Sequence, residues 1–332
     1  MTDWKQLYGD ELRRCPVLVT GGAGFIGSHL CDALVALGAE VTMLDDLSGG
    51  DPDNLAHHTS SGSSGLRFVE GSILDEDVLA ASVKGRRFVF HQAALPSVPR
   101  SIEHPRLFHD VNVNGTVDVL EAARAAGVER VTFAASSSAY GDSEELPKVE
   151  TITPTPCSPY AANKVCGEQM MRAWASSYGL DTISLRYFNI FGPRQNANSA
   201  YAGVIAAFAK AVLNGVAPVI YGDGLQSRDF TFVENVVHAN LLAVRSGDRL
   251  GGNVINVGCG DRITVNRLAE TMAEVAGGAS PPPEHRPVRQ GDVLHSLADL
   301  GQAEALIGYR PIVGFREGLE ATVDWYRAEE PW

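Results

Sequence analysis

PVLVTGGAGFIG, residues 16–27, is the stretch of this 332-residue chain that decides its fold. Its apolar first half predicts a buried strand, and residues 25–37 predict a helix. Gly21, Gly24 and Gly27 allow a tight turn, a close approach of the backbone to a phosphate, and close packing of helix on strand. The start of the helix offers N–H groups to such a phosphate. The stretch predicts a dinucleotide-binding turn, and the alternative is a Gly-rich turn without a ligand.

Apolar runs continue to alternate with helical patterns through the first half of the chain. Strands are expected at residues 40–44, 67–70, 88–91, 130–134 and 182–187, helices at 105–126 and 160–178, and a surface loop at 48–65. This alternation predicts an α/β fold with a doubly wound parallel sheet of the Rossmann type, covered on both faces. The pattern becomes irregular after residue 189. We therefore expect a nucleotide-binding domain at 1–189 and a smaller substrate-binding lobe at 190–332, with segments that can interleave.

An acidic residue ends the second expected strand. A carboxylate at Asp45 can accept hydrogen bonds from the adenosine ribose and would repel a 2′-phosphate, which favours NAD over NADP. Asp46 either shares this role or is a simple turn residue.

The bulk composition excludes several classes of partner. A net charge of −13 argues against binding of nucleic acid or an anionic membrane. The most apolar long stretch, 201–220, is interrupted by Lys210 and Asn214 and predicts no membrane span. The first residues have no signal-peptide pattern. The five cysteines show no metal-ligand spacing, so we expect reduced thiols, no metal site and a cytoplasmic location.

Tyr160 and Lys164 lie four residues apart and share one face of an expected helix. A free tyrosine at neutral pH lies about 4 kcal/mol from its ionised form, and a nearby ammonium reduces that deficit. Tyr160 could then act as a base toward a hydroxyl. Ser136, just past an expected strand, could bind the same oxygen at the carboxyl edge of the sheet. Without the preceding dinucleotide motif, the pair would instead indicate a surface Tyr with a solvated Lys.

The order of these motifs resembles that of the extended short-chain dehydrogenases/reductases of the nucleotide-sugar epimerase type. The shared blocks are residues 21–27, 112–116, 134–141, 158–164, 185–189, 222–224, 228–230 and 289–292. Within the family, residues 91–95, 134–138 and 146–150 are most similar to those of bacterial UDP-N-acetylglucosamine 4-epimerases.

The resemblance implies a role for each residue at a matching position. Tyr160 would be the base, Lys164 its helper and Ser136 the hydroxyl that shares the substrate oxygen. NAD would be bound by Gly21, Gly24, Phe25, Ile26, Gly27, Asp45, Asp46, Ser72, Ile73, Gln92, Ala93, Ala94, Asn112, Tyr160, Lys164 and Phe188. The UDP-sugar would be bound by Ser136, Ser137, Ser138, Tyr160, Asn189, Gln195, Arg228, Arg289, Asp292 and Ser296. Arginines suit a diphosphate in so acidic a chain because they bind it bidentately.

The resemblance also bears on the reaction. Dehydratase and decarboxylase relatives carry an acidic residue at or near the position after the catalytic hydroxyl, whereas Ser137 and Ser138 stand here. This favours reversible C4 epimerisation through a transient 4-keto sugar. Ser296 replaces a Tyr of the enzymes restricted to glucose and galactose, which favours the UDP-N-acetylglucosamine/UDP-N-acetylgalactosamine pair. Three departures are Ser72, where Asp is usual, Asp46, where Asn is frequent, and Pro96, where the most similar sequences have Gly.

Three alternatives stay open at this point. The substrate could be the UDP-glucose/UDP-galactose pair or a UDP-uronate, with Ser296 only a loop residue. The chain could also be a non-catalytic dinucleotide sensor. The family resemblance further implies a homodimer in which the helices at 105–126 and 160–178 pair across a two-fold axis.

Overall fold

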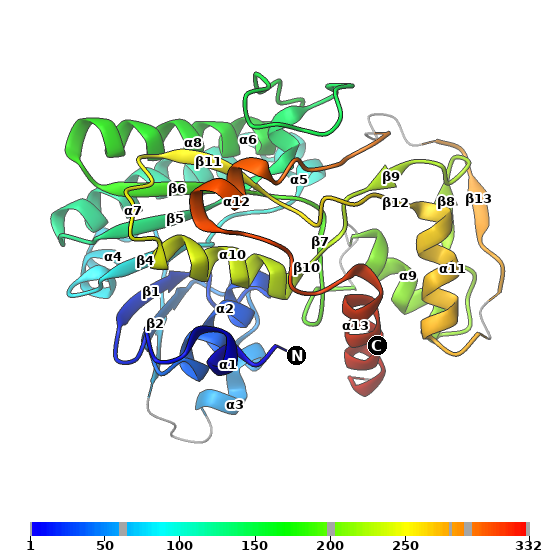
Figure 1. The fold of residues 1–332 in the computed structure, drawn as a ribbon, viewed down its shortest axis with the longest axis horizontal. Coiled ribbons are helices and arrows are strands. Elements are labelled where there is room, and N and C mark those ends of the chain that lie inside the picture. The colour runs from blue at the N-terminus through cyan, green and yellow to red at the C-terminus, as the bar shows by residue number, and fades with distance from the viewer. Residues whose placement is uncertain (1, 60–64, 198–202, 279–280, 289–293, 330–332) are drawn as a thin grey trace.

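A seven-stranded parallel sheet forms the centre of the protein (Figure 1). The computed structural model describes residues 2–59, 65–197, 203–278, 281–288 and 294–329. The sheet order is β11-β6-β5-β4-β1-β2-β3. These strands are β1 (Pro16–Thr20), β2 (Glu40–Asp45), β3 (Leu66–Glu70), β4 (Phe88–His91), β5 (Arg130–Ser136), β6 (Asp181–Tyr187) and β11 (Asn253–Val257). The predicted Rossmann-type sheet is confirmed.

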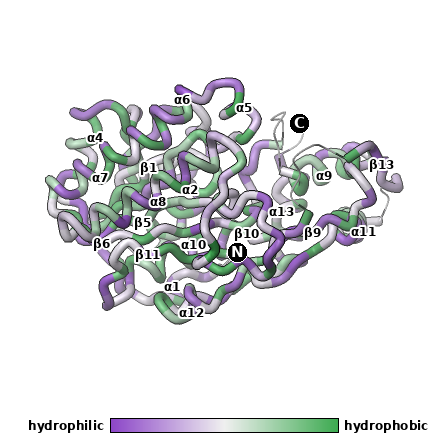
Figure 2. The backbone as a smooth tube through the Cα atoms, turned by 90° about the horizontal axis from the view of Figure 1, so that it is seen from above, coloured by the Kyte–Doolittle hydropathy of each residue, from purple (hydrophilic) through white to green (hydrophobic). Residues whose placement is uncertain are grey.

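Alternate residues of each strand face opposite helical layers. Val17 and Val19 of β1 pack in one apolar cluster, and Leu18 packs in another on the opposite face. The first layer contains α1 (Trp4–Tyr8), α2 (Phe25–Ala36), α10 (Val233–Arg245) and α12 (Gly301–Ile307), and the second contains α4 (Glu76–Val83), α7 (Gly115–Ala125) and α8 (Pro159–Tyr178). Figure 2 shows the hydrophobic residues of α10 inside the molecule and the hydrophilic β13 at its edge.

A smaller lobe lies beside the carboxyl edge of the sheet (Figure 1). Its helices are α9 (Val204–Leu213), α11 (Val265–Val275) and α13 (Phe315–Ala328), which share one apolar cluster with Phe191 and Phe232. Its short strands are β7 (Ile190–Phe191), β8 (Val219–Tyr221), β9 (Ser227–Arg228), β10 (Thr231–Phe232), β12 (Ile263–Thr264) and β13 (Glu284–Arg286).

Two elements from beyond residue 190 belong to the sheet rather than to the lobe. β11 pairs in parallel with β6, from Asn253 opposite Ile183 to Val257 opposite Tyr187. Helix α10 packs over the sheet, with Val237 and Leu241 in the same cluster as β1. A single boundary at residue 190 therefore does not describe these elements. A parallel partner needs a long crossover, so the chain leaves the sheet after β6 and returns.

Two expected segments differ in detail from the sequence prediction. The helix expected at 105–126 consists of α6 (Pro105–His109), a π-helical turn at Asp110–Asn114 and α7. The wide turn sets the side chain of Asn112 against the main chain of Leu95. The loop expected at 48–65 contains the helical turns Pro52–Leu55 and α3 (Ala56–Thr59).

Buried ion pairs fasten α8 and the strands below it. Glu168 of α8 and Arg186 of β6 form two hydrogen bonds of 2.8 Å, and both side chains are almost fully buried. At the other end of the strands, Arg130 of β5 bonds Asp181 of β6 at 2.6 Å. The first pair holds α8 against β6, and the second joins β5 to β6. Helix α8 carries the candidate catalytic pair.

Two further findings concern the state of the cysteines and the search for a membrane-spanning helix. All five cysteines are free thiols. Within the described residues, no helix is both long and apolar enough to cross a membrane.

Candidate functional site

The glycine turn after β1 leaves no room for side chains. Gly21 has φ +69°, and a Cβ there would lie 2.6 Å from the amide nitrogen of Ala93. A Cβ on Gly27 would lie 2.0 Å from the carbonyl oxygen of Gly21. Helix α2 starts after Gly24, and no side chain of the described residues caps its first N–H groups. Phe25 and Ile26 provide this first turn, so the N–H groups remain for an anion.

Asp45 braces this turn from the end of β2. One carboxylate oxygen accepts from the amide of Ala23 and the other from the amide of Leu47, both at 2.9 Å. Burial raises the pKa of Asp45. Each oxygen keeps a further lone pair for a ribose hydroxyl. Asp46 is exposed and accepts from the amide of Ser48 at 3.0 Å, which is the turn role that the sequence left open.

The segment after β4 closes the other side of the turn. The side chain of Gln92 accepts from the Tyr187 hydroxyl at 3.1 Å, and the amide of Ala93 donates to Thr20. Ala94 follows, partly exposed. Asn112 spends both amide atoms on the main chain of Leu95, at 2.8 and 3.1 Å. Asn112 therefore shapes this segment, and its side chain amide has little left for a cofactor.

Three other residues that were expected to contact the cofactor differ from one another in how much of their surface is exposed. Ser72 keeps partial exposure, and its hydroxyl accepts from the amide of Leu74 at 3.2 Å. Ile73 is 5% exposed and belongs mainly to the core. Phe188 has no exposed surface and packs on Tyr140 with ring centroids 6.1 Å apart. A nicotinamide beside Phe188 would need a surface that this packing does not leave, so Phe188 supports the site from behind.

The candidate catalytic side chains meet at the ends of β5 and α8. The side chain of Tyr160 lies close enough to Ser136, the last residue of β5, for the serine to lower the pKa of the phenol. Ser138 donates to the Ser136 oxygen from its amide at 3.2 Å and from its hydroxyl at 2.9 Å. Because the Ser136 oxygen accepts in both bonds, its own hydroxyl hydrogen remains available for donation to Tyr160. Ser137 stands between the two serines and is partly exposed.

Lys164 is buried one turn further along α8. Its ammonium donates to the carbonyl of Ala134 at 2.7 Å and lies 4.9 Å from the centre of the Phe133 ring. Burial lowers the pKa of Lys164 to about 7, and the carboxylate of Glu168 partly offsets this. Burial likewise raises the pKa of Tyr160, while Ser136 lowers it. Burial thus opposes charge on both groups.

The candidate sugar-binding residues converge next to the end of β6. Asn189, at φ +35°, donates to the carbonyl of Asp229 at 3.2 Å and to the hydroxyl of Ser296 at 3.4 Å. The amide of Ser296 donates to the carbonyl of Ser227, and Arg228 follows on β9. Asn189, Arg228 and Ser296 are therefore neighbours although 107 residues separate the first and last.

Three other residues were expected to contact the sugar nucleotide: Gln195, Arg289 and Asp292. Gln195 donates from its side chain to the carbonyl of Ile190 at 3.1 Å, and its own carbonyl accepts from Tyr326 of α13. This places Gln195 within the smaller lobe. Arg289 and Asp292 lie outside the described residues.

Two buried residues, Asp229 and Lys148, organise the site although the sequence pattern predicted no role for either. Asp229 has no exposed surface and accepts from the amides of Cys259, Gly260 and Ala298. Burial raises its pKa to about 6. Lys148 exchanges main-chain bonds with the segment 297–299, which ties the loop after Ser136 to the Ser296 segment. A third buried residue, Glu168, could have been found from the sequence, because it stands four residues after Lys164 and therefore shares its helical face.

Comparison with known proteins shows which family the chain matches. Residues 17–258 match the model of the NAD dependent epimerase/dehydratase family. The chain is 42% identical to a UDP-glucose 4-epimerase of Mycolicibacterium smegmatis over 313 residues, 93% of this chain and 98% of that protein.

Two solved structures are also similar. A UDP-N-acetylglucosamine 4-epimerase of Methanobrevibacter ruminantium, in complex with UDP-N-acetylmuramic acid, has a TM-score of 0.90 and 40% identity and covers 96% of this chain and 100% of that one. A UDP-glucose 4-epimerase of Thermus thermophilus in complex with NAD has a TM-score of 0.84 and 38% identity, over 95% and 100%. The predicted cofactor, NAD, is confirmed.

His91 makes the stability of this site sensitive to acid. The ring is buried between the hydroxyls of Thr20 and Thr116, at 2.8 and 3.0 Å, and burial lowers its pKa to about 3. In the unfolded chain the pKa is about 6.5, so only the unfolded state gains this proton as the pH falls from 6.5 toward 3. The contribution of His91 to stability is therefore complete above pH 6.5 and is lost below it.

We predict that His91→Gln flattens this dependence. Urea unfolding between pH 6 and pH 4 should show a slope of the free energy of unfolding that is smaller by up to about 1.4 kcal/mol per pH unit than in the parent protein. His285→Gln, a change of an exposed histidine, should leave the slope unaltered. Equal slopes in His91→Gln and the parent protein would show that His91 is not held neutral.

Proposed function

The chain belongs to the NAD dependent epimerase/dehydratase family, and we propose that it is a UDP-hexose 4-epimerase. The observation that carries the proposal is the meeting of Tyr160, Ser136 and Lys164 at the end of β5, on the same edge of the parallel sheet as the glycine turn that follows β1. The preferred substrates are the UDP-N-acetylglucosamine/UDP-N-acetylgalactosamine pair. The UDP-glucose/UDP-galactose pair is the second candidate, because the similar proteins include 4-epimerases described for both kinds of sugar.

In this mechanism Tyr160 takes the proton of the C4 hydroxyl and Ser136 holds the same oxygen. NAD bound at this site would supply a reversible acceptor for the hydride of C4. Tyr160 would return the proton to the oxygen of the transient 4-keto sugar once the sugar presents its other face. The cycle consumes no oxidant and leaves the enzyme unchanged. Lys164 and the glycine turn Gly21–Gly27 are the residues that would hold the ribose and the pyrophosphate.

The charge state of Lys164 controls the base. A protonated Lys164 stabilises the phenolate of Tyr160, since opposite charges at short range favour the ionised form. Because burial lowers the pKa of Lys164 to about 7, the ammonium depends on its neighbours, namely the carbonyl of Ala134 and the carboxylate of Glu168. Ser136 adds to the same effect on Tyr160.

Ser137 and Ser138 support epimerisation over dehydration or decarboxylation. Moving a proton at a carbon next to C4 requires an acid or base there, and both side chains are neutral hydroxyls. Ser138 is already committed to Ser136 through its amide and hydroxyl. The intact set of Tyr160, Lys164 and Ser136 also disfavours the alternative of a dinucleotide sensor, which has no need of a base.

The substrate preference rests on Ser296. This side chain is 9% exposed and lies against Asn189 at 3.4 Å, at the junction of sheet and lobe. A small residue there leaves volume for a 2-acetamido group. Arg228, with Arg289 and Asp292, is proposed to hold the UDP part. A UDP-uronate is a weaker candidate, because no feature of the described residues selects a carboxylate at C6.

Tyr160→Phe tests the base directly. Removing the hydroxyl should lower kcat for C4 interconversion by about 10²- to 10⁴-fold, because proton transfer to a positioned base contributes that much. Tyr178→Phe, at the exposed end of the same helix, should leave kcat unchanged. Activity of Tyr160→Phe at the parent level, measured by NMR of the product epimer, would disprove the assignment.

Ser296→Tyr tests the sugar preference. The larger side chain should reduce kcat/KM for the N-acetylated pair at least about tenfold more than for UDP-galactose, because a pocket rejects added groups by steric exclusion. Ser296→Ala should retain both activities. Equal losses for both sugars in Ser296→Tyr would refute the role of Ser296 in specificity without touching the assignment of the base.

We also propose that two copies pair through the outer surfaces of α7 and α8. Apolar side chains are exposed around α8: Ile102 of α5 (Val98–Glu103) at 64%, Leu107 of α6 at 46% and Tyr178 at 56%. A two-fold axis would bury such side chains against their copies. Light scattering at micromolar concentration should give twice the 35.4 kDa of one chain. A mass of one chain would rule the dimer out.

A further inference from the structure

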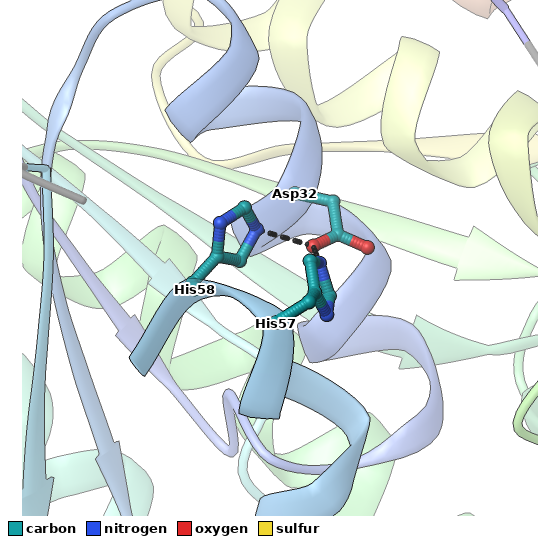
Figure 3. A group of neighbouring side chains, drawn as sticks. All are labelled: Asp32, His57 and His58. Atoms are coloured by element: carbon teal, nitrogen blue, oxygen red, sulfur yellow. Dashed lines mark hydrogen bonds and ion pairs between the residues drawn. The ribbon is translucent and has the colours of Figure 1, made fainter. Parts of the chain in front are cut away.

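Three side chains with metal-binding chemistry meet on the outer side of the dinucleotide helix (Figure 3). Asp32 projects from α2, while His57 and His58 project from α3. One oxygen of Asp32 accepts from Nε2 of His57 at 3.0 Å and from Nε2 of His58 at 2.7 Å. The three potential ligand atoms all lie within 4.8 Å of one another. Neither the glycine turn nor the candidate base uses any of them.

The second oxygen of Asp32 is held by a different partner. Nη1 of Arg194 lies 2.7 Å from Oδ2. Carboxylates that ligate a metal through one oxygen are commonly hydrogen-bonded through the other, and that bond orients the ligand. This ion pair occupies Oδ2 of Asp32 and leaves Oδ1 facing the two imidazoles.

The donor set and its spacing suit a zinc-like cation. Two imidazole nitrogens and one carboxylate oxygen are typical zinc ligands, with bonds of about 2.0–2.2 Å. Ligand atoms around one tetrahedral ion are then about 3.3 Å apart. The observed nitrogen-to-oxygen separations of 3.0 and 2.7 Å need only a small opening. Side-chain exposures of 52% for His57, 16% for His58 and 26% for Asp32 leave access for the ion and a water ligand.

We propose that Asp32, His57 and His58 form a binding site for one zinc-like divalent cation. The site would join α3 to α2, which starts at the glycine turn. Asp45, the last residue of β2, and Asp46 stand at the start of the segment that leads from β2 to α3. A cation here would therefore fix the segment 46–58 against the dinucleotide helix. The sequence gave no hint of this, because 25 residues separate Asp32 from His57.

Calorimetric titration of the purified holoenzyme with zinc chloride tests the proposal. After removal of bound metals by a chelator, we expect one zinc per chain with micromolar or tighter affinity. Asp32→Asn and His58→Ala should weaken this binding at least about tenfold, as each removes one ligand of three. His285→Ala, a change of an exposed histidine outside the cluster, should leave the affinity unchanged.

A second measurement separates the site from misfolding. Asp32→Asn also removes the partner of Arg194, so His57→Ala serves as the milder variant, since His57 is half exposed. Zinc should raise the Tm of the parent protein and of His285→Ala but not that of His57→Ala. No saturable binding in the parent, or equal zinc affinity in the parent and in His57→Ala and His58→Ala, overturns the proposal. Neither result bears on C4 epimerisation.

Discussion

The buried ammonium of Lys164 is the interaction on which the arrangement of the site depends. Removing a charge from water costs several kcal/mol unless its surroundings compensate. The compensation comes from the carbonyl of Ala134, the face of the Phe133 ring and the carboxylate of Glu168. Two of these lie on β5, so satisfying Lys164 draws α8 onto that strand. Tyr160, one turn earlier, is thereby brought to Ser136, and the pairing of Glu168 with Arg186 fastens the same helix to β6.

A second buried charge organises the side of the site that faces the sugar. Asp229 accepts three amide hydrogen bonds from two segments distant in sequence. Its own carbonyl accepts from Asn189, whose amide also reaches Ser296. The lobe and the sheet thus meet through hydrogen bonds to one fully buried residue, and a small movement of either segment would change the volume beside Ser296. Substrate preference and fold are physically coupled at this junction.

Much of this architecture follows from local sequence patterns. The glycine turn, the strands of the first half and α8 are predictable because apolar runs and glycine positions act over a few residues. The return of β11 to the sheet was not, since a parallel crossover places residue 253 beside residue 183 without a local signal. For the same reason the motif at Asn112 was visible, whereas its use in holding Leu95 was not. Asp32 and its histidines, like Asn189 and Ser296, meet only through the tertiary fold.

The most direct test of the central claim is the fate of the hydrogen on C4. The holoenzyme, without added NAD, is incubated in deuterated water with UDP-N-acetylglucosamine and, in parallel, UDP-glucose, and the products are followed by NMR. If Tyr160 moves only the hydroxyl proton and the hydride returns to the carbon it left, at least one sugar will yield its C4 epimer with protium at C4. Deuterium at C4, loss of water from the sugar, or no epimer from either substrate would contradict the account.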